Sequence, residues 1–75
     1  MSKNIKLNTQ GIIINGEDKG WYIYIEEDLK NTGGYYIFIE KTLEKDSEGY
    51  DEWVENMDCL KNYFVESQWE VKWLD

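Results

Sequence analysis

The sequence contains no arginine, histidine, proline or alanine, and it contains one cysteine. Without histidine, the usual proton shuttle near neutral pH and the commonest metal ligand are both missing. Without arginine, and with a net charge of −8, few cationic groups can contact phosphates, so we expect no direct nucleic-acid binding. The single Cys59 cannot form an internal disulfide, which favours a reducing compartment.

Long apolar runs are also missing from the sequence. No run approaches the ~18 residues of a membrane-spanning helix, and the polar stretch after Met1 lacks the apolar core of a signal peptide. We therefore expect a cytoplasmic protein that makes no membrane contact. At 75 residues, the chain is predicted to be one acidic domain, residues 1–75.

Motifs for catalysis, metal binding or cofactor binding are missing too. The glycines fall in predicted turns and form no phosphate loop before a helix. The segment Asp46–Asp51 partly matches a calcium loop but lacks its ligand spacing and closing glutamate. Cys59 has no histidine to activate it and lies near the apolar stripe of a predicted helix, so we expect a buried structural thiol. We predict no enzyme activity, catalytic residue, metal or small-molecule cofactor.

Aromatic side chains make up 16% of the chain, with four tryptophans and six tyrosines. Disordered acidic chains are poor in such residues. Each buried ring removes roughly 150–250 Å² from water. The sequence therefore predicts a compact fold whose small core is built from large side chains.

Two segments alternate between inward and outward side chains as strands do. The first is Trp21–Glu26, preceded by Gly20, and the same pattern returns fourteen residues later after Gly34, as Tyr35–Glu40. The Asn-Thr-Gly-Gly sequence between them is a strong turn signal. We predict that the two segments form an antiparallel hairpin.

Two more segments are expected to be strands of the same sheet. Ile5 and Leu7 can begin a strand, and the β-branched run 11–15 reads as a short strand. Residues 50–55 are compatible with a strand or with the first turns of a helix. Gly49 and the aromatic content favour the strand.

A helix and a final strand complete the predicted order. Asn56 is placed to cap the helix, with Asp58 in the first turn, where the helix dipole favours an anion. The helix is expected to end near Ser67, and its apolar positions recur at helical spacing. Those positions are Met57, Leu60 and Phe64. The final strand is indicated by the alternating residues Trp69, Val71 and Trp73.

These elements predict an α+β fold: an antiparallel sheet of four to five strands with one helix packed on one face, in the order β-β-β-β-α-β. We expect the helix to cover the aliphatic face, which carries Trp21, Ile23, Ile25, Ile37, Ile39, Val71 and Trp73. The opposite face carries Tyr22, Tyr24, Tyr36 and Phe38, with Glu26 and Glu40 at its border. Its rings either stabilise the hairpin across the strands or form a surface for a partner or a second copy.

Negative charge is concentrated in the middle of the chain. Residues 40–58 contain eight carboxylates and two lysines, a net charge of −6, whereas residues 1–16 carry +2. Such a block is either a solvated, solubilising surface or an electrostatic steering patch for a basic protein.

The stretch from Gly11 to Leu29, GIIINGEDKGWYIYIEEDL, resembles a pattern of bacterial polymorphic-toxin immunity proteins. In immunity protein family 53, a strand opening Gly-x-x-Ile runs through a short acidic turn into Gly-Trp and an alternating strand. An acidic Asp-x-Trp element, here Asp51-Glu52-Trp53, and a short helix follow. The resemblance covers about half of the chain. It implies a cytoplasmic inhibitor that binds a toxin and blocks its active site, without chemistry of its own.

We therefore expect a small acidic protein-binding domain, an immunity or inhibitor protein that blocks a basic partner such as a toxin or nuclease. One alternative is a bacterial housekeeping domain that homodimerises through the aromatic sheet face. Another is a phage protein that mimics DNA with carboxylates spaced like phosphates. The predicted partner-binding residues are Tyr36, Phe38, Glu48, Tyr50, Asp51, Glu52, Trp53 and Glu55.

Overall fold

The structure, a computed structural model, describes residues 5–74 and confirms the predicted α+β order. The strands are β1 (Gln10–Asn15), β2 (Tyr22–Asp28), β3 (Gly34–Glu40), β4 (Gly49–Val54) and β5 (Glu70–Trp73), and the helix is α1 (Met57–Ser67). The segment that was compatible with either strand or helix is therefore a strand, β4. No helix within residues 5–74 is long and apolar enough to span a membrane.

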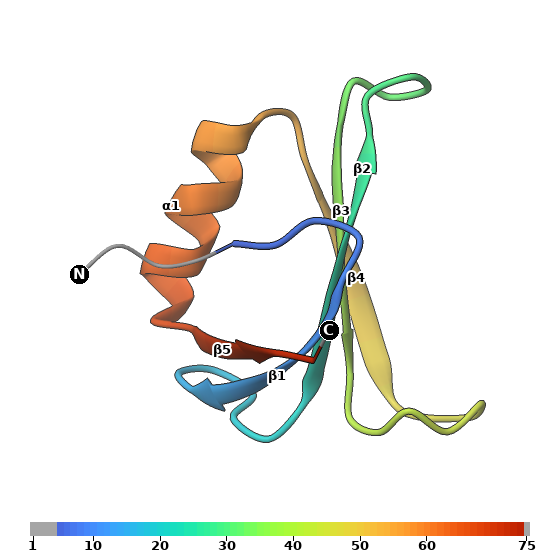
Figure 1. Cartoon of the computed structure of the whole chain (residues 1–75), viewed down its shortest axis with the longest axis vertical. Helices are drawn as coiled ribbons and strands as arrows, with labels where there is room; N and C mark the ends of the chain where they lie inside the picture. Colours follow the sequence, from blue (N-terminus) through green and yellow to red (C-terminus); the bar gives the residue numbers. More distant parts are fainter. Residues whose placement is uncertain (1–4, 75) are drawn as a thin grey trace.

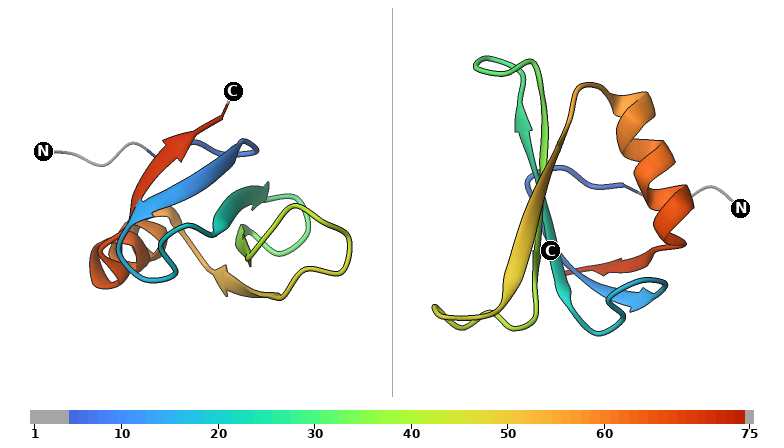
Figure 2. Two further views of the ribbon diagram at one scale, coloured as in Figure 1. Left: turned by 90° about the horizontal axis from the view of Figure 1, so that it is seen from below. Right: turned by 180° about the vertical axis from the view of Figure 1, so that it is seen from behind.

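The five strands form one antiparallel sheet in the order β4-β3-β2-β1-β5. The pair β2 and β3 is the predicted hairpin, aligned from Tyr22 opposite Glu40 to Asp28 opposite Gly34. In Figure 1, β2, β3 and β4 run side by side, while β1 and β5 turn away beneath α1. Figure 2 shows the same bend from two further directions. The sheet thus curls around the helix, and no helix or strand of residues 5–74 covers its outer side.

The face of the sheet turned toward α1 forms the core. Four of its predicted aliphatic residues are fully buried: Ile23, Ile25, Ile37 and Ile39. Three other predicted members are only partly buried against this core: Trp21, Val71 and Trp73. The remaining core side chains are Ile13, Tyr35, Leu60, Phe64 and Trp69. One helix is therefore sufficient to close the aliphatic side of the sheet.

Helix α1 begins and ends with local hydrogen bonds. At its start, the side chain of Asn56 accepts a hydrogen bond from the backbone N–H of Cys59 at 2.8 Å, which confirms the predicted cap. At its end, Gln68 adopts a left-handed conformation with φ 57°, and its N–H donates to the carbonyls of Phe64 and Val65. This left-handed residue turns the chain directly into β5.

Two expectations for apolar residues were wrong. Ile5 and Leu7 form no strand, because the chain turns at Asn8, whose φ is 55°. The N–H of Asn8 donates to the carbonyl of Ile25 at 2.6 Å, and both apolar side chains pack, partly buried, against the core. Cys59 is half-buried instead of buried, since it lies at the margin of the apolar stripe of α1.

Candidate binding surface

The outer side of the sheet carries five large rings. Residues directly opposite each other in an antiparallel pair project to the same face. Tyr24 lies opposite Phe38 and Tyr36 lies opposite Trp53, while Tyr22 shares the outer side of β2 with Tyr24. We call this surface the aromatic face, and its residues are Tyr22, Tyr24, Tyr36, Phe38 and Trp53.

The rings of the aromatic face are partly exposed to water, and two of them stack. Tyr36 and Phe38 stack with ring centroids 5.9 Å apart and planes inclined by 18°. Trp53 is 43% exposed, and the other four residues are half-buried. Each ring is thus partly exposed, on a side of the sheet that no described helix or strand covers.

Trp53 is held by a glycine beneath it and by a hydrogen bond at its edge. Its indole lies so close to Gly34 that a Cβ there would come within 2.7 Å of two ring atoms and would also meet the Val54 carbonyl. The indole N–H donates to the hydroxyl of Thr32 at 2.8 Å. The orientation of the ring is therefore set by contacts within this chain.

Three exposed carboxylates border the aromatic face. Each one lies directly opposite a ring on the neighbouring strand. Glu26 lies opposite Tyr36, Glu40 lies opposite Tyr22, and Asp51 lies opposite Phe38. We call these three residues the acidic rim.

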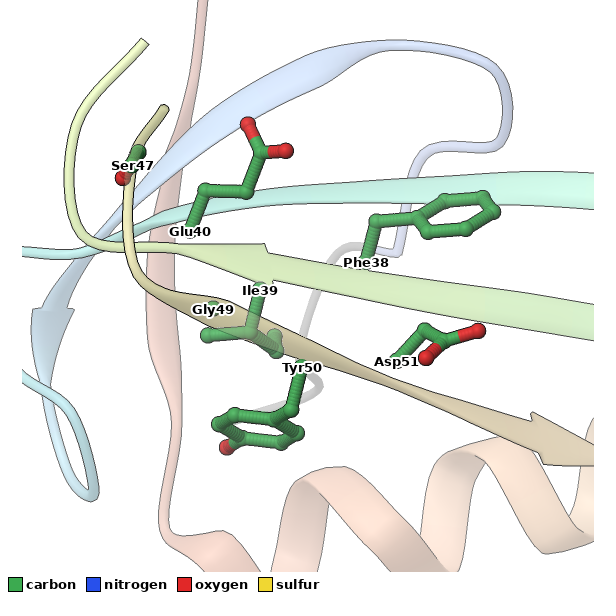
Figure 3. A pocket seen from close by; sticks show the side chains of 7 residues that line it. All are labelled: Phe38, Ile39, Glu40, Ser47, Gly49, Tyr50 and Asp51. Carbon is green, nitrogen blue, oxygen red and sulfur yellow. The ribbon is translucent and has the colours of Figure 1, made fainter. Parts of the chain in front are cut away.

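A shallow hollow of about 250 Å³ opens where the acidic rim meets β4. In Figure 3, Phe38 and Glu40 rise from β3 on one side of the sheet, while Tyr50 points the other way. Asp51 lies beside them on β4, and Gly49 contributes backbone alone, which leaves the space next to Glu40 open. Two carboxylates and a phenyl ring together suit an ammonium or guanidinium group.

The structure places the eight predicted partner-binding residues on both sides of the sheet and in two connecting segments. Four lie together on the outer side: Tyr36, Phe38, Asp51 and Trp53. Tyr50 and Glu52 project toward α1, because neighbouring residues of a strand alternate between faces. Glu48 lies in the loop before β4, where its carbonyl accepts the N–H of Lys41, and Glu55 lies between β4 and α1. These residues therefore do not form one surface.

Tyr50 and Glu52 belong to a second group, which sequence reasoning missed. The hydroxyl of Tyr50 donates to Oδ2 of Asp18 at 2.5 Å, and a hollow of about 190 Å³ lies nearby, lined by Glu17, Tyr63, Glu66 and Ser67. We call this group the tyrosine–carboxylate cluster: Glu17, Asp18, Tyr50, Glu52, Tyr63 and Glu66. No sequence signal indicates it, because it requires the β1–β2 turn to meet the end of α1.

Two hydrogen bonds bring that turn to the helix. The N–H of Glu17 donates to the carbonyl of Ser67 at 3.0 Å. The indole N–H of Trp69 donates to the carbonyl of Glu17 at 2.7 Å. The position of the cluster is thus set by backbone contacts between segments about fifty residues apart in the chain.

Both tyrosines of the cluster are poor acids in the folded protein. Burial raises the pKa of Tyr50, and its hydrogen bond to Asp18 and the charge of that residue raise it further. Burial also raises the pKa of Tyr63, as do the negative charges of Glu52, Glu17 and Asp18. Both hydroxyls therefore keep their protons to a higher pH than an exposed tyrosine does, and that of Tyr50 donates to Asp18.

The raised pKa of Tyr50 predicts a loss of stability at high pH. The unfolded state releases the Tyr50 proton at a lower pH than the folded state does. The stability that the protonated Tyr50 hydroxyl contributes is therefore complete below about pH 10 and is lost as the pH rises toward the folded-state pKa. Above pH 10, we expect the free energy of unfolding to fall less steeply in Tyr50→Phe than in the wild type, measured by urea unfolding across a pH series. Val65→Ala, which changes an exposed residue of α1 that has no ionisable group, should retain the wild-type slope. A Tyr50→Phe slope equal to that of the wild type would contradict the prediction.

Within residues 5–74, no three histidine, cysteine, aspartate or glutamate side chains are arranged to hold a metal ion. Comparisons of the chain with protein-family models, with curated proteins and with solved structures found no match. Its function is therefore inferred from the aromatic face and the acidic rim.

Proposed function

We propose that this chain is a small acidic inhibitor of the immunity-protein kind, which binds a basic protein such as a toxin or nuclease in the cytoplasm and blocks it. The observation that carries the proposal is the aromatic face with its acidic rim. Tyrosine and tryptophan offer large contact areas and are enriched among the residues that dominate binding energy. The net charge of −8 favours fast association with a cationic protein.

The aromatic face also has the rigidity that an inhibitor needs. Its rings project from paired strands, and Trp53 is fixed by Gly34 and Thr32. A preformed surface loses little conformational entropy on binding, so more of its contact energy contributes to affinity. Inhibition by coverage requires no catalytic group on this chain.

The test is capture at low salt of a protein from the source cells, followed by inhibition of that protein's own activity with the purified chain. We expect a basic protein whose affinity falls about thirtyfold with Tyr36→Ala, since truncating a central binding residue costs about 2 kcal/mol. Asp51→Lys should slow association. The matched controls are Val65→Ala, which truncates a 64% exposed residue of α1, and Glu66→Lys, which changes the net charge equally on the helix side.

Two results would contradict the proposal. The first is a captured protein whose binding changes as much with the controls as with Tyr36→Ala and Asp51→Lys. The second is a tight dimer in sedimentation that Tyr36→Ala disrupts, because the aromatic face would then serve homodimerisation. Circular dichroism of each variant distinguishes lost binding from lost folding.

A further inference from the structure

Strand β4 is the outermost strand at one end of the sheet, and it leaves backbone groups available there. The N–H of Lys41 donates to the carbonyl of Glu48 at 2.8 Å, and the register of β3 with β4 continues from that pair. In this register Tyr50 and Glu52 exchange hydrogen bonds with β3, so the N–H and carbonyl groups of Asp51 and Trp53 point away from the sheet. In the described part of the chain, no other element bonds to them.

The same two residues direct their side chains to the aromatic face. A strand laid along β4 would place every second side chain beside Asp51 and Trp53 on the outer side of the sheet. The hollow lined by Glu40, Phe38 and Asp51 lies across β4 from this edge, and Gly49 has no side chain to separate the two (Figure 3). Backbone pairing at the edge and side-chain recognition at the hollow are therefore available to one extended segment.

Charge determines which segment fits. The hollow offers two carboxylates beside a phenyl ring, and a lysine or arginine placed there would gain both ion pairing and a cation–π contact. Glu52 adds a third carboxylate, next to Asp51 on β4. An acidic segment along this edge would oppose like charges, which destabilises cross-strand pairs.

We propose that β4 binds an extended, lysine- or arginine-rich segment of a protein partner, which joins the five-stranded sheet as an added strand. One basic side chain of that segment enters the hollow between Glu40 and Asp51. The proposal rests on the proposed function, because it specifies how the basic partner is held. Backbone hydrogen bonds supply the alignment, and alternate basic side chains supply the selectivity.

The first experiment uses a capped synthetic peptide, slightly longer than β4, in which lysine alternates with valine. We expect it to bind, to shift the amide signals of Asp51 and Trp53 most strongly in NMR spectra, and to bind more weakly as salt is added. A peptide with glutamate in place of lysine should not bind. N-methylation of the two amides that face β4 should weaken binding about tenfold, whereas N-methylation of the alternate amides should not.

The second experiment varies the protein. Asp51→Pro removes an outward N–H and leaves every hydrogen bond between β3 and β4 intact, so the fold should persist. Asp51→Asn removes the charge but keeps the N–H. We expect both variants to bind the lysine peptide more weakly than the wild type, and Asp51→Pro to bind most weakly. Thermal unfolding of both variants provides the folding control.

The outcomes separate this proposal from the proposed function. The edge pairing would be overturned if the lysine peptide did not bind. It would also be overturned if neither N-methylation nor Asp51→Pro weakened the binding and the NMR shifts centred on Tyr22 and Tyr24. Inhibition of a basic protein through the aromatic face would still stand after either result. Conversely, peptide binding at β4 without any inhibited partner would overturn the proposed function and leave the edge pairing intact.

Discussion

Replacing Gly16 with alanine is expected to remove about half of the stability of this protein. Gly16 has a φ of 99°, which an L side chain adopts at a cost of about 1–2 kcal/mol. Its added Cβ would also lie 2.7 Å from the Ser67 carbonyl oxygen and would meet the Gln68 carbonyl. Such overpacking costs about 1–3 kcal/mol more. Together these terms reach roughly half of the 4–11 kcal/mol expected for a chain of this size at about 0.05–0.15 kcal/mol per residue.

Gly20→Ala is the matched control. Gly20 has a similar φ of 94°, but a Cβ there would have no neighbour within 4 Å. It should therefore cost only the backbone strain, about 1–2 kcal/mol. Urea unfolding followed by circular dichroism measures both variants. Equal losses for the two substitutions would mean that the β1–β2 turn does not pack against the end of α1.

Trp69→Ala should cost about 3–5 kcal/mol, the usual range for truncating a buried tryptophan. Trp69 is 1% exposed. Its ring meets Phe64 edge-on at 5.2 Å and lies 5.3 Å from the ring of Tyr63. The residue therefore links the helix, the last strand and, through its indole N–H, the carbonyl of Glu17.

A pair of phenylalanine variants isolates the role of that indole N–H. Trp69→Phe leaves the Glu17 carbonyl without its donor in a partly buried position, which costs about 1–3 kcal/mol beyond the lost packing. Trp53→Phe loses an equivalent bond to Thr32 at an exposed position, where water replaces it. We expect Trp69→Phe to lower the free energy of unfolding clearly more than Trp53→Phe. A larger loss in Trp53→Phe would show that the exposed indole is the structural one.

The parts of the fold that could be predicted depend on local signals. Alternation around an Asn-Thr-Gly-Gly turn specifies the β2–β3 hairpin, and Asn56 before an apolar stripe specifies the start of α1. The strand order could not be read from the sequence in the same way. β1 lies between β2 and β5, because one of its edges pairs with the next strand along the chain and the other pairs with the last strand, and no local pattern encodes that choice.

The candidate site was predictable to the same extent. Alternation places Tyr36 and Phe38 on the outer side correctly, since the hairpin was assigned. In β4, the choice between strand and helix was open, and Tyr50 and Asp51 were grouped as one surface, although these neighbouring residues project their side chains from opposite faces of the sheet. The tyrosine–carboxylate cluster depends on a contact between Glu17 and Ser67, which only the folded chain creates.

The carboxylates of β4 also affect how two copies of this protein meet. If the β4 strands of two molecules aligned antiparallel, Asp51 and Glu52 would confront the same acidic residues of the other molecule. Natural sheets use charged side chains on edge strands in this way to resist fibre-like growth. At about 1 M salt, where screening extends over only about 3 Å, that resistance weakens. Concentrated, salty solutions are therefore the conditions in which this acidic chain is most prone to stack into longer sheets.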